Sequence, residues 1–232
     1  LNMDKEMDKY RQDTVAIRSG YQRTYENEHA EAMFLTSSYV FESAEMAAKY
    51  FSNELQGNVY SRYTNPTVRS FEQRLAAMEE GEQCVATASG MAAALSVIMA
   101  LLQSGDHVVC SQDVFGSTRV MMDKYITKFG VAVTYVPLAD LDAWQNAIQP
   151  NTKLVFGEVL GNPGLEVLDI PSLSEVAHAH HLPLLIDATF VTPYLCQPIE
   201  LGADLVVHSA TKFLSGHGVV VGGVVVDGGT FD

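Results

Sequence analysis

The chain has 232 residues, of which 47% are hydrophobic and 18% charged, enough apolar material for one large core or two modest ones. Its 28 acidic and 14 basic residues give a formal net charge of −14, which argues against binding to nucleic acid or to an anionic membrane surface. The first residues are acidic and lack a long apolar stretch, so we expect neither a secretory signal nor a membrane anchor there. The three cysteines are an odd number and show no C-x-x-C spacing, which is typical of free, buried thiols in a reducing compartment. We therefore expect a cytoplasmic protein.

The N-terminal part of the sequence indicates an arm and not part of a sheet. A helical pattern runs from residue 4 to about Arg18, where Ser19-Gly20 is a typical stop signal, and a second short helix is expected near residues 44–51. Asn65 is a candidate helix cap before Pro66, and apolar residues then recur at helical spacing. We divide the chain into an arm, residues 1–59, and a larger domain, residues 60–232.

Beyond Gly81, short β-rich runs alternate with helical runs. The runs are apolar without in–out alternation, which predicts an α/β domain with a mainly parallel sheet covered by helices on both faces. Ligands of such sheets bind at the carboxyl ends of the strands. The expected strands are 83–87, 107–111, 132–136, 154–159, 183–187, 205–208 and 219–226, and the expected helices are 91–102, 118–129, 141–148 and 173–181.

Lys212 is the first candidate for chemistry. It ends the segment His208-Ser209-Ala210-Thr211-Lys212, which directly follows a predicted buried strand. A primary amine in a partly desolvated pocket can lose its proton and attack an aldehyde to form an imine. The alternative is a surface lysine in a loop whose Ser and Thr only cap backbone groups.

Three further segments supply context for Lys212. Ser89 and Gly90 open a helix directly after a strand, where backbone N–H groups and the helix dipole favour a phosphate, although such a turn is also an ordinary cap. Asp187 ends an apolar strand, and its carboxylate could keep a pyridine nitrogen protonated. The alternatives are a helix cap or a metal ligand. Arg62 lies among tyrosines in residues 60–63, and its planar guanidinium suits a phosphate. The alternative is that this cluster forms an interface patch.

We expect no metal site. His178 and His181 lie on one side of a predicted helix, but no further ligand is predicted nearby, so a solvated helix face is the better interpretation.

Four blocks of the sequence, in their order, resemble the pyridoxal-phosphate (PLP) enzymes of cysteine and methionine metabolism, which have the aspartate-aminotransferase-like fold, or fold type I. The resemblance extends over nearly the whole chain from about Tyr21. The four blocks are YSRYTNPT at 60–67, ATASGM at 86–91, GNP at 161–163 and HSATK at 208–212.

The resemblance implies PLP as the cofactor and assigns a role to each matching residue. Lys212 matches the Schiff-base lysine and Asp187 the partner of the pyridine nitrogen. The turn at Ser89, together with Gly90, Met91, Ser209 and Thr211, matches the phosphate cradle, and Asn162 matches a position near cofactor and substrate. Phe115 stands where many members stack a tyrosine on the cofactor ring; because phenylalanine cannot transfer a proton, any acid–base role falls to Lys212 or Tyr60.

The resemblance also implies a homo-oligomer. In the family, residues matching Tyr60 and Arg62 reach the phosphate of the neighbouring subunit, so we expect a dimer or a dimer of dimers with shared active sites.

Two departures from the family pattern affect these expectations. Ala188 follows Asp187 where the family usually has asparagine. Members also continue beyond the position of Asp232 into a C-terminal domain, whose arginine holds the substrate's α-carboxylate. The resemblance implies that this domain is missing, and we expect the 232 residues to bind PLP but to need a further segment for catalysis.

The implied reaction is γ-replacement on O-acylhomoserine by sulfide, which gives homocysteine. Residues 63–68 and 114–118 look most like O-succinylhomoserine sulfhydrylases, whereas 160–164 and 216–218 favour the O-acetylhomoserine enzymes. Cystathionine γ-synthase and methionine γ-lyase are further alternatives, although Ser117 stands where the lyases tend to have a reactive cysteine. An alternative of another class is a truncated, non-catalytic interaction protein that keeps the sheet.

Overall fold

The structure is a computed structural model that describes residues 10–231. The chain forms two compact units, Leu1–Ala77 and Met78–Asp232. The expected boundary between an arm and a cofactor domain, after residue 59, stays a prediction.

The first unit contains helices α1 (Gln12–Arg18) and α2 (Ala44–Phe51) and most of α3 (Pro66–Glu79). The expected bounds of α2 are confirmed, and the Ser43 hydroxyl caps it by accepting the Met46 N–H. At the start of α3, the Asn65 carboxamide accepts the Thr67 N–H at 2.9 Å, as expected of a cap. The part of the first predicted helix before residue 10 lies outside the described residues.

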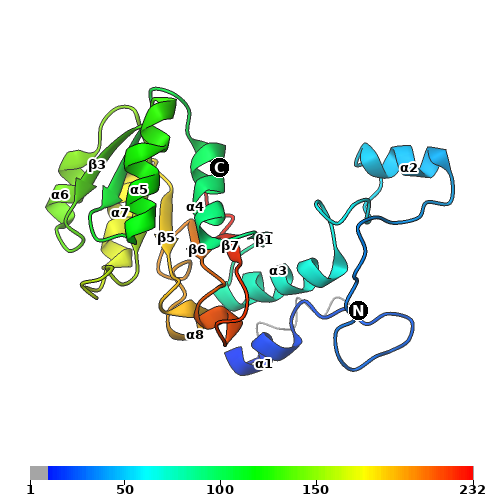
Figure 1. Cartoon of the computed structure of the whole chain (residues 1–232). Coiled ribbons are helices and arrows are strands. Elements are labelled where there is room, and N and C mark those ends of the chain that lie inside the picture. The colour runs from blue at the N-terminus through cyan, green and yellow to red at the C-terminus, as the bar shows by residue number, and fades with distance from the viewer. Residues whose placement is uncertain (1–9, 232) are drawn as a thin grey trace. The chain divides into compact units, whose positions relative to one another are not determined.

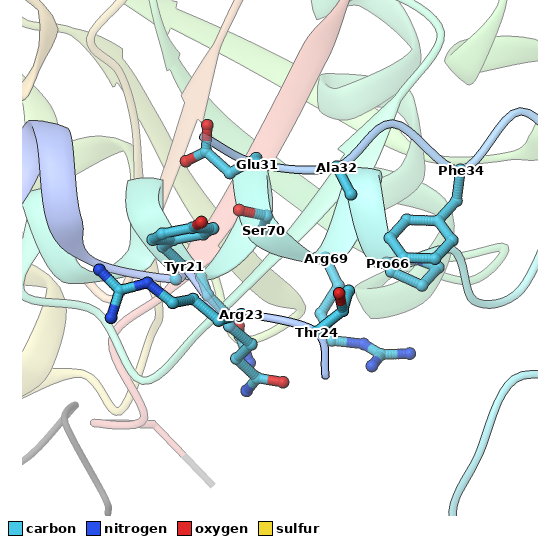
Figure 2. A pocket seen from close by; sticks show the side chains of 12 residues that line it. Tyr21, Arg23, Thr24, Glu31, Ala32, Phe34, Pro66, Arg69 and Ser70 are labelled. Atoms are coloured by element: carbon cyan, nitrogen blue, oxygen red, sulfur yellow. The ribbon is translucent and has the colours of Figure 1, made fainter. Parts of the chain in front are cut away.

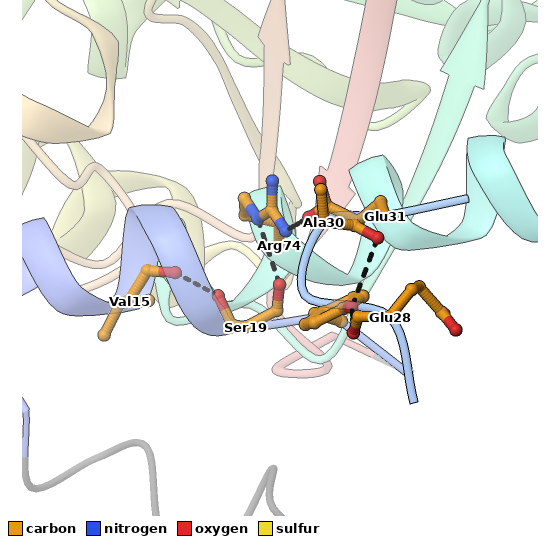
Figure 3. A network of polar contacts seen from close by, with 7 residues as sticks. Val15, Ser19, Glu28, Ala30, Glu31 and Arg74 are labelled. Atoms are coloured by element: carbon orange, nitrogen blue, oxygen red, sulfur yellow. Dashed lines mark hydrogen bonds and ion pairs between the residues drawn. The ribbon is translucent and has the colours of Figure 1, made fainter. Parts of the chain in front are cut away.

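Polar contacts tie the end of α1 to α3 (Figure 3). The guanidinium of Arg74 donates to the Ser19 carbonyl at 3.0 Å and pairs with the Glu31 carboxylate. Gly20 ends α1 at a φ of +69°, and a Cβ there would lie 2.5 Å from the Ser70 carbonyl oxygen. Glycine is therefore required by both the backbone conformation and the close approach.

The same unit has a small cavity of about 210 Å³ (Figure 2). Tyr21, Arg23 and Phe34 are among its lining residues. The Tyr21 hydroxyl donates to the backbone carbonyl of Glu28, and the Arg23 Nε donates to the same carbonyl at 3.2 Å. These side chains thus hold the loop that surrounds the cavity.

The second unit is an α/β domain (Figure 1). Its seven-stranded sheet has the strand order β1-β7-β6-β5-β4-β2-β3. Strands β2 to β6 are parallel, while β7 pairs antiparallel with both β1 and β6. Hence β1 and β6 run in the same direction, and the carboxyl ends of β1 to β6 lie at one edge. The strands are β1 (Gln83–Thr87), β2 (His107–Ser111), β3 (Ala132–Val136), β4 (Thr152–Glu158), β5 (Leu184–Asp187), β6 (Leu205–His208) and β7 (Gly223–Asp227).

Helices cover both faces of this sheet, as the unbroken apolar strands predicted. Val108 and Cys110 of β2 belong to the same buried cluster as Met122 of α5, while Val109, between them, is equally buried. On the sheet, α4 packs against β6 and β7, α6 against β3, and α7 against β5. The helices are α4 (Gly90–Leu101), α5 (Gly116–Lys124), α6 (Leu141–Ala147), α7 (Ile170–Ala179) and α8 (Thr192–Leu195), with 3-10 turns η2 (Ile126–Phe129) and η3 (Phe213–Ser215).

Among residues 10–231, none of the helices combines the length and apolar character needed to cross a bilayer.

The last strand is a correction to the prediction. It begins at Gly223 and not at Val219, and residues 219–221 are exposed. The apolar run continues across the true start of the strand, so composition alone could not locate it. Its antiparallel direction is also the exception in the otherwise parallel sheet.

Candidate functional site

A pocket of about 790 Å³ lies at the carboxyl ends of the strands in the second unit. Its wall comes from segments that follow β1, β2, β4, β5 and β6. It is lined by every predicted site residue outside the first unit: Ser89, Gly90, Met91, Phe115, Asn162, Asp187, Ser209, Thr211 and Lys212. Residues far apart in sequence therefore meet where the parallel sheet predicted a ligand site.

The start of α4 forms one side of this pocket. The Ser89 hydroxyl caps the helix by accepting the Ala92 N–H at 3.1 Å, while the remaining N–H groups of the first turn have no intrahelical partner. Gly90 approaches the segment after β6 so closely that a Cβ on it would lie 2.6 Å from the Ser209 Cβ. Likewise, a Cβ on Gly223 would lie 2.1 Å from the Ser89 carbonyl oxygen. Small residues thus bring a helix N-terminus beside two hydroxyl side chains, an arrangement suited to a phosphate.

The segment after β6 is fixed by its own hydrogen bonds. The Ser209 N–H donates to the Thr189 hydroxyl at 2.8 Å. Thr211 bonds Gly222 twice, accepting its N–H at 3.1 Å and donating to its carbonyl at 3.2 Å. Lys212 follows, lines the pocket and is exposed. The partial desolvation that we expect for its amine stays a prediction.

Two carboxyl groups end neighbouring strands on the pocket floor. Asp187 ends β5 and accepts the Thr189 N–H at 2.9 Å; burial raises its pKa, while the Thr189 hydrogen bonds and His208 oppose that rise. Glu158 ends β4 and is paired with Asp187 in the strand register. It is 4% exposed and accepts the Phe115 N–H at 2.5 Å. Burial and the charge of Asp187 raise the pKa of Glu158 to about 8.

Glu158 is a site residue that the sequence did not reveal. We expected a strand running through it to Val159, which made it one polar residue inside an apolar run. The available signal was its likeness to Asp187, since each is a carboxylate that directly follows a run of apolar residues.

Phe115 and Asn162 hold the segment after β2 close to the end of β4. Phe115 precedes α5 and is 45% exposed in the pocket wall. The Asn162 N–H donates to the Asp113 carbonyl at 2.8 Å, two residues before Phe115. The position of Phe115 therefore depends on β4 as well as on its own helix.

Tyr60 and Arg62 belong to the first unit. The Arg62 guanidinium carbon lies 4.6 Å from the ring centroid of Tyr63 and 5.5 Å from that of Tyr60. Such cation–π contacts orient the guanidinium group. The role that we expect for Tyr60 and Arg62 at the cofactor stays a prediction.

A buried carboxyl–imidazole pair, Glu79 with His208, adjoins the segment after β6. Glu79 Oε1 and His208 Nε2 are 2.5 Å apart, and both side chains are fully buried. Their other polar atoms, Glu79 Oε2 and His208 Nδ1, have no hydrogen-bond partner. Because His208 directly precedes Ser209, the pair fixes the end of β6.

Removing one member of this pair should destabilise the protein strongly. We expect Glu79→Ala to lower the free energy of unfolding by about 3 kcal/mol or more, since it leaves a buried imidazole unpaired. Urea denaturation measures the change, with Glu175→Ala on the exposed side of α7 as the control. A loss below about 1 kcal/mol would contradict a structural role for the pair.

His178, the histidine within α7, contacts two polar groups. His178 Nε2 lies 2.9 Å from a carboxylate oxygen of Asp204, and its Nδ1 lies 3.3 Å from the Ser174 hydroxyl. Within residues 10–231, no group of three His, Cys, Asp or Glu side chains is placed to hold a metal ion.

Comparison with known proteins identifies the family. The family model described as Cys/Met metabolism PLP-dependent enzyme matches residues 13–232. The chain belongs to this family. Two similar relatives are an O-succinylhomoserine sulfhydrylase of Pseudomonas aeruginosa, 55% identical over 98% of this chain, and an O-acetyl-L-homoserine sulfhydrylase of Corynebacterium glutamicum, 46% identical over 86%. An L-methionine gamma-lyase of Fusobacterium nucleatum is 42% identical over 95% of the chain.

A solved structure has the same fold as this chain. The crystal structure of an O-acetylhomoserine (thiol)-lyase of Campylobacter jejuni is 33% identical, covers 94% of this chain and superposes with a TM-score of 0.90. That structure contains N'-pyridoxyl-lysine-5'-monophosphate. Fold type I is thereby confirmed for this chain. The chain spans 56% of the Pseudomonas relative's length, 46% of the Corynebacterium relative's and 54% of the Campylobacter chain.

Proposed function

We propose that the second unit binds PLP through Lys212 and that the protein takes part in γ-replacement on O-acylhomoserine, with sulfide as the nucleophile and homocysteine as the product. The observation that carries the proposal is the pocket at the carboxyl ends of the strands. There an amine, a buried carboxyl and a helix N-terminus come together.

The residues of the pocket fit PLP in shape and in chemistry. The close approach of Gly90 to Ser209 leaves the first turn of α4 facing the hydroxyl side chains, which suits a phosphate dianion. Asp187 provides a carboxylate for a ring nitrogen, Phe115 an aromatic face and Lys212 an amine for an aldehyde. The phosphate, the ring nitrogen and the aldehyde of the cofactor thus each have a partner in one pocket.

The residues of the chain then have distinct tasks. When bound, PLP supplies a ring that accepts the electrons released at the substrate's Cα. Asp187, when ionised, holds a proton on the ring nitrogen and so favours that acceptance. The Lys212 amine takes the Cα proton and returns protons as the acyloxy group leaves from Cγ. Phe115 has no proton to give, so proton transfer falls to Lys212 or to Tyr60.

The acyl group of the substrate is proposed as succinyl. The 55% identity to an O-succinylhomoserine sulfhydrylase supports this choice over acetyl, for which the relative is 46% identical. The test, made as are all turnover assays below on protein supplied with the further segment that we expect catalysis to need, compares homocysteine formation from O-succinylhomoserine and from O-acetylhomoserine, each with sulfide. A higher kcat/KM for the succinyl ester is expected; a preference for the acetyl ester would reverse the assignment, and release of methanethiol from methionine would favour the lyase.

We further propose a cytoplasmic homo-oligomer in which Tyr60 and Arg62 act at the partner's pocket. The family resemblance of residues 60–67 supports this, as does the orientation of Arg62 by the tyrosine rings. In the part of the chain that the structure describes, no cysteine is joined in a disulfide, which agrees with a reducing compartment.

Gly90 provides a test of the proposed phosphate cradle. Gly90→Ala should raise the Kd for PLP about tenfold or more, because the new Cβ would overlap Ser209 and move the helix away from the phosphate. Gly164→Ala is a matched control, since no atom lies within 4 Å of its added Cβ. Equal PLP affinity of the two variants in a fluorescence titration would count against the cradle.

A further inference from the structure

Glu158 is a buried acid of the pocket that the proposed chemistry does not use. In the register of β4 and β5, Glu158 stands beside Asp187. Neighbouring parallel strands are ~4.8 Å apart, and paired residues point to the same face of the sheet. Both residues line the pocket. The fold therefore forces two carboxyl groups together where little water reaches one of them.

Two such groups do not readily carry two negative charges. Asp187 has more to stabilise its anion, since Thr189 donates hydrogen bonds to it and His208 lies near enough to lower its pKa. Glu158 has one such contact, the N–H of Phe115. The proton of the pair is therefore better placed on Glu158, and the charge on Asp187.

The same Glu158 contact fixes an aromatic wall of the pocket. Two hydrogen bonds tie the segment between β2 and α5 to the end of β4: the Phe115 N–H to the Glu158 carboxyl, and the Asn162 N–H to the Asp113 carbonyl. Phe115 is 45% exposed in the pocket wall, so less than full burial holds its ring. Loss of the Glu158 acceptor should break one of these two hydrogen bonds.

We propose that Glu158 is a positioning residue of this site: it keeps its proton, so that Asp187 carries the negative charge of the pair, and it holds the turn of Phe115. This inference deepens the proposed function and rests on it for the use of Asp187. Of the titratable groups near the pair, Asp187 from β5 and Cys110 from β2 interact with Glu158, and His208 from β6 interacts with Asp187. Lys212 and His217, from the segment after β6, line the same pocket.

The position of the proton can be measured without cofactor. In the purified protein labelled with 13C at the glutamate carboxyl carbons, one resonance should stay in the protonated form at pH 6 and titrate near pH 8, as the raised pKa of Glu158 requires. Glu158→Gln should remove this resonance, whereas the control Glu175→Gln should leave it in place. A Glu158 resonance already ionised at pH 6 would overturn the proposal.

The hold on Phe115 is tested by PLP binding at pH 7. Glu158→Gln keeps a carbonyl acceptor and should bind PLP within about threefold of the wild type, whereas Glu158→Leu should bind about tenfold more weakly. Equal affinity of all three proteins would refute the positioning role. The 13C titration decides the proton's position even if Glu158→Leu fails to fold. If the wild type binds no PLP, the proposed function fails, while the resonance near pH 8 still reports on Glu158.

Discussion

Replacing Lys212 by Ala is expected to abolish covalent attachment of PLP and to lower homocysteine formation by about 10³-fold or more. Both effects have the same cause, because the amine is the only nucleophile that we assign to the aldehyde and the base that we assign to the Cα proton. General acid–base catalysis alone contributes about 10²–10⁴-fold. The phosphate cradle stays intact, so the variant should still bind PLP reversibly, and dialysis should remove the cofactor.

The matched control is Lys124→Ala, which removes an exposed lysine at the end of α5, away from the pocket residues. It should keep both the visible absorption of bound PLP and the rate of the wild type. Turnover by Lys212→Ala within about tenfold of this control would show that another group takes the Cα proton.

The second large effect is expected for Asp187→Asn. Asparagine keeps the size of the side chain and an oxygen that accepts the Thr189 N–H, but it loses the negative charge. We expect kcat to fall by about 10²–10³-fold, because the ring nitrogen no longer has a charged partner when electrons move into the ring. PLP should still attach to Lys212, so the defect should appear in turnover and not in borohydride labelling.

The pH profile gives an independent check on Asp187. Burial raises the pKa of its carboxyl, so the ionised form is lost at a higher pH than for an ordinary aspartate. Activity of the wild type should therefore fall on the acid side while exposed aspartates are still ionised. This fall should be missing from the residual activity of Asp187→Asn; the same acid limb in the variant would assign the titration to another group.

Much of the fold could be predicted from the sequence because its strands are short apolar runs between turn residues. The bounds of β1, β2, β3 and β6 agree with prediction residue by residue. The start of β7 could not be predicted, because Val219 and its neighbours are as apolar as the strand but remain exposed. Periodicity reports which residues suit a sheet, whereas pairing decides where a strand begins.

The site residues likewise include some that the sequence could predict and some that it could not. Lys212 and Asp187 could be found because each follows an apolar strand, and parallel strands end at one edge of a sheet. For Glu158 the likeness to Asp187 was a weak local signal, but its importance comes from the strand order that places β4 beside β5. The pairing of Glu79 with His208, 129 residues apart, likewise depends on tertiary structure and leaves no local signal.

The central claim is that Lys212 holds PLP covalently, and the direct measurement is reduction with borohydride followed by peptide mapping. The purified protein is incubated with PLP, reduced, digested and analysed by mass spectrometry. We predict a single pyridoxyl-phosphate label on the peptide that contains Lys212, and no such label in Lys212→Ala. A label on another lysine, or none on any peptide of the wild type, would contradict the assignment of this pocket as the PLP site.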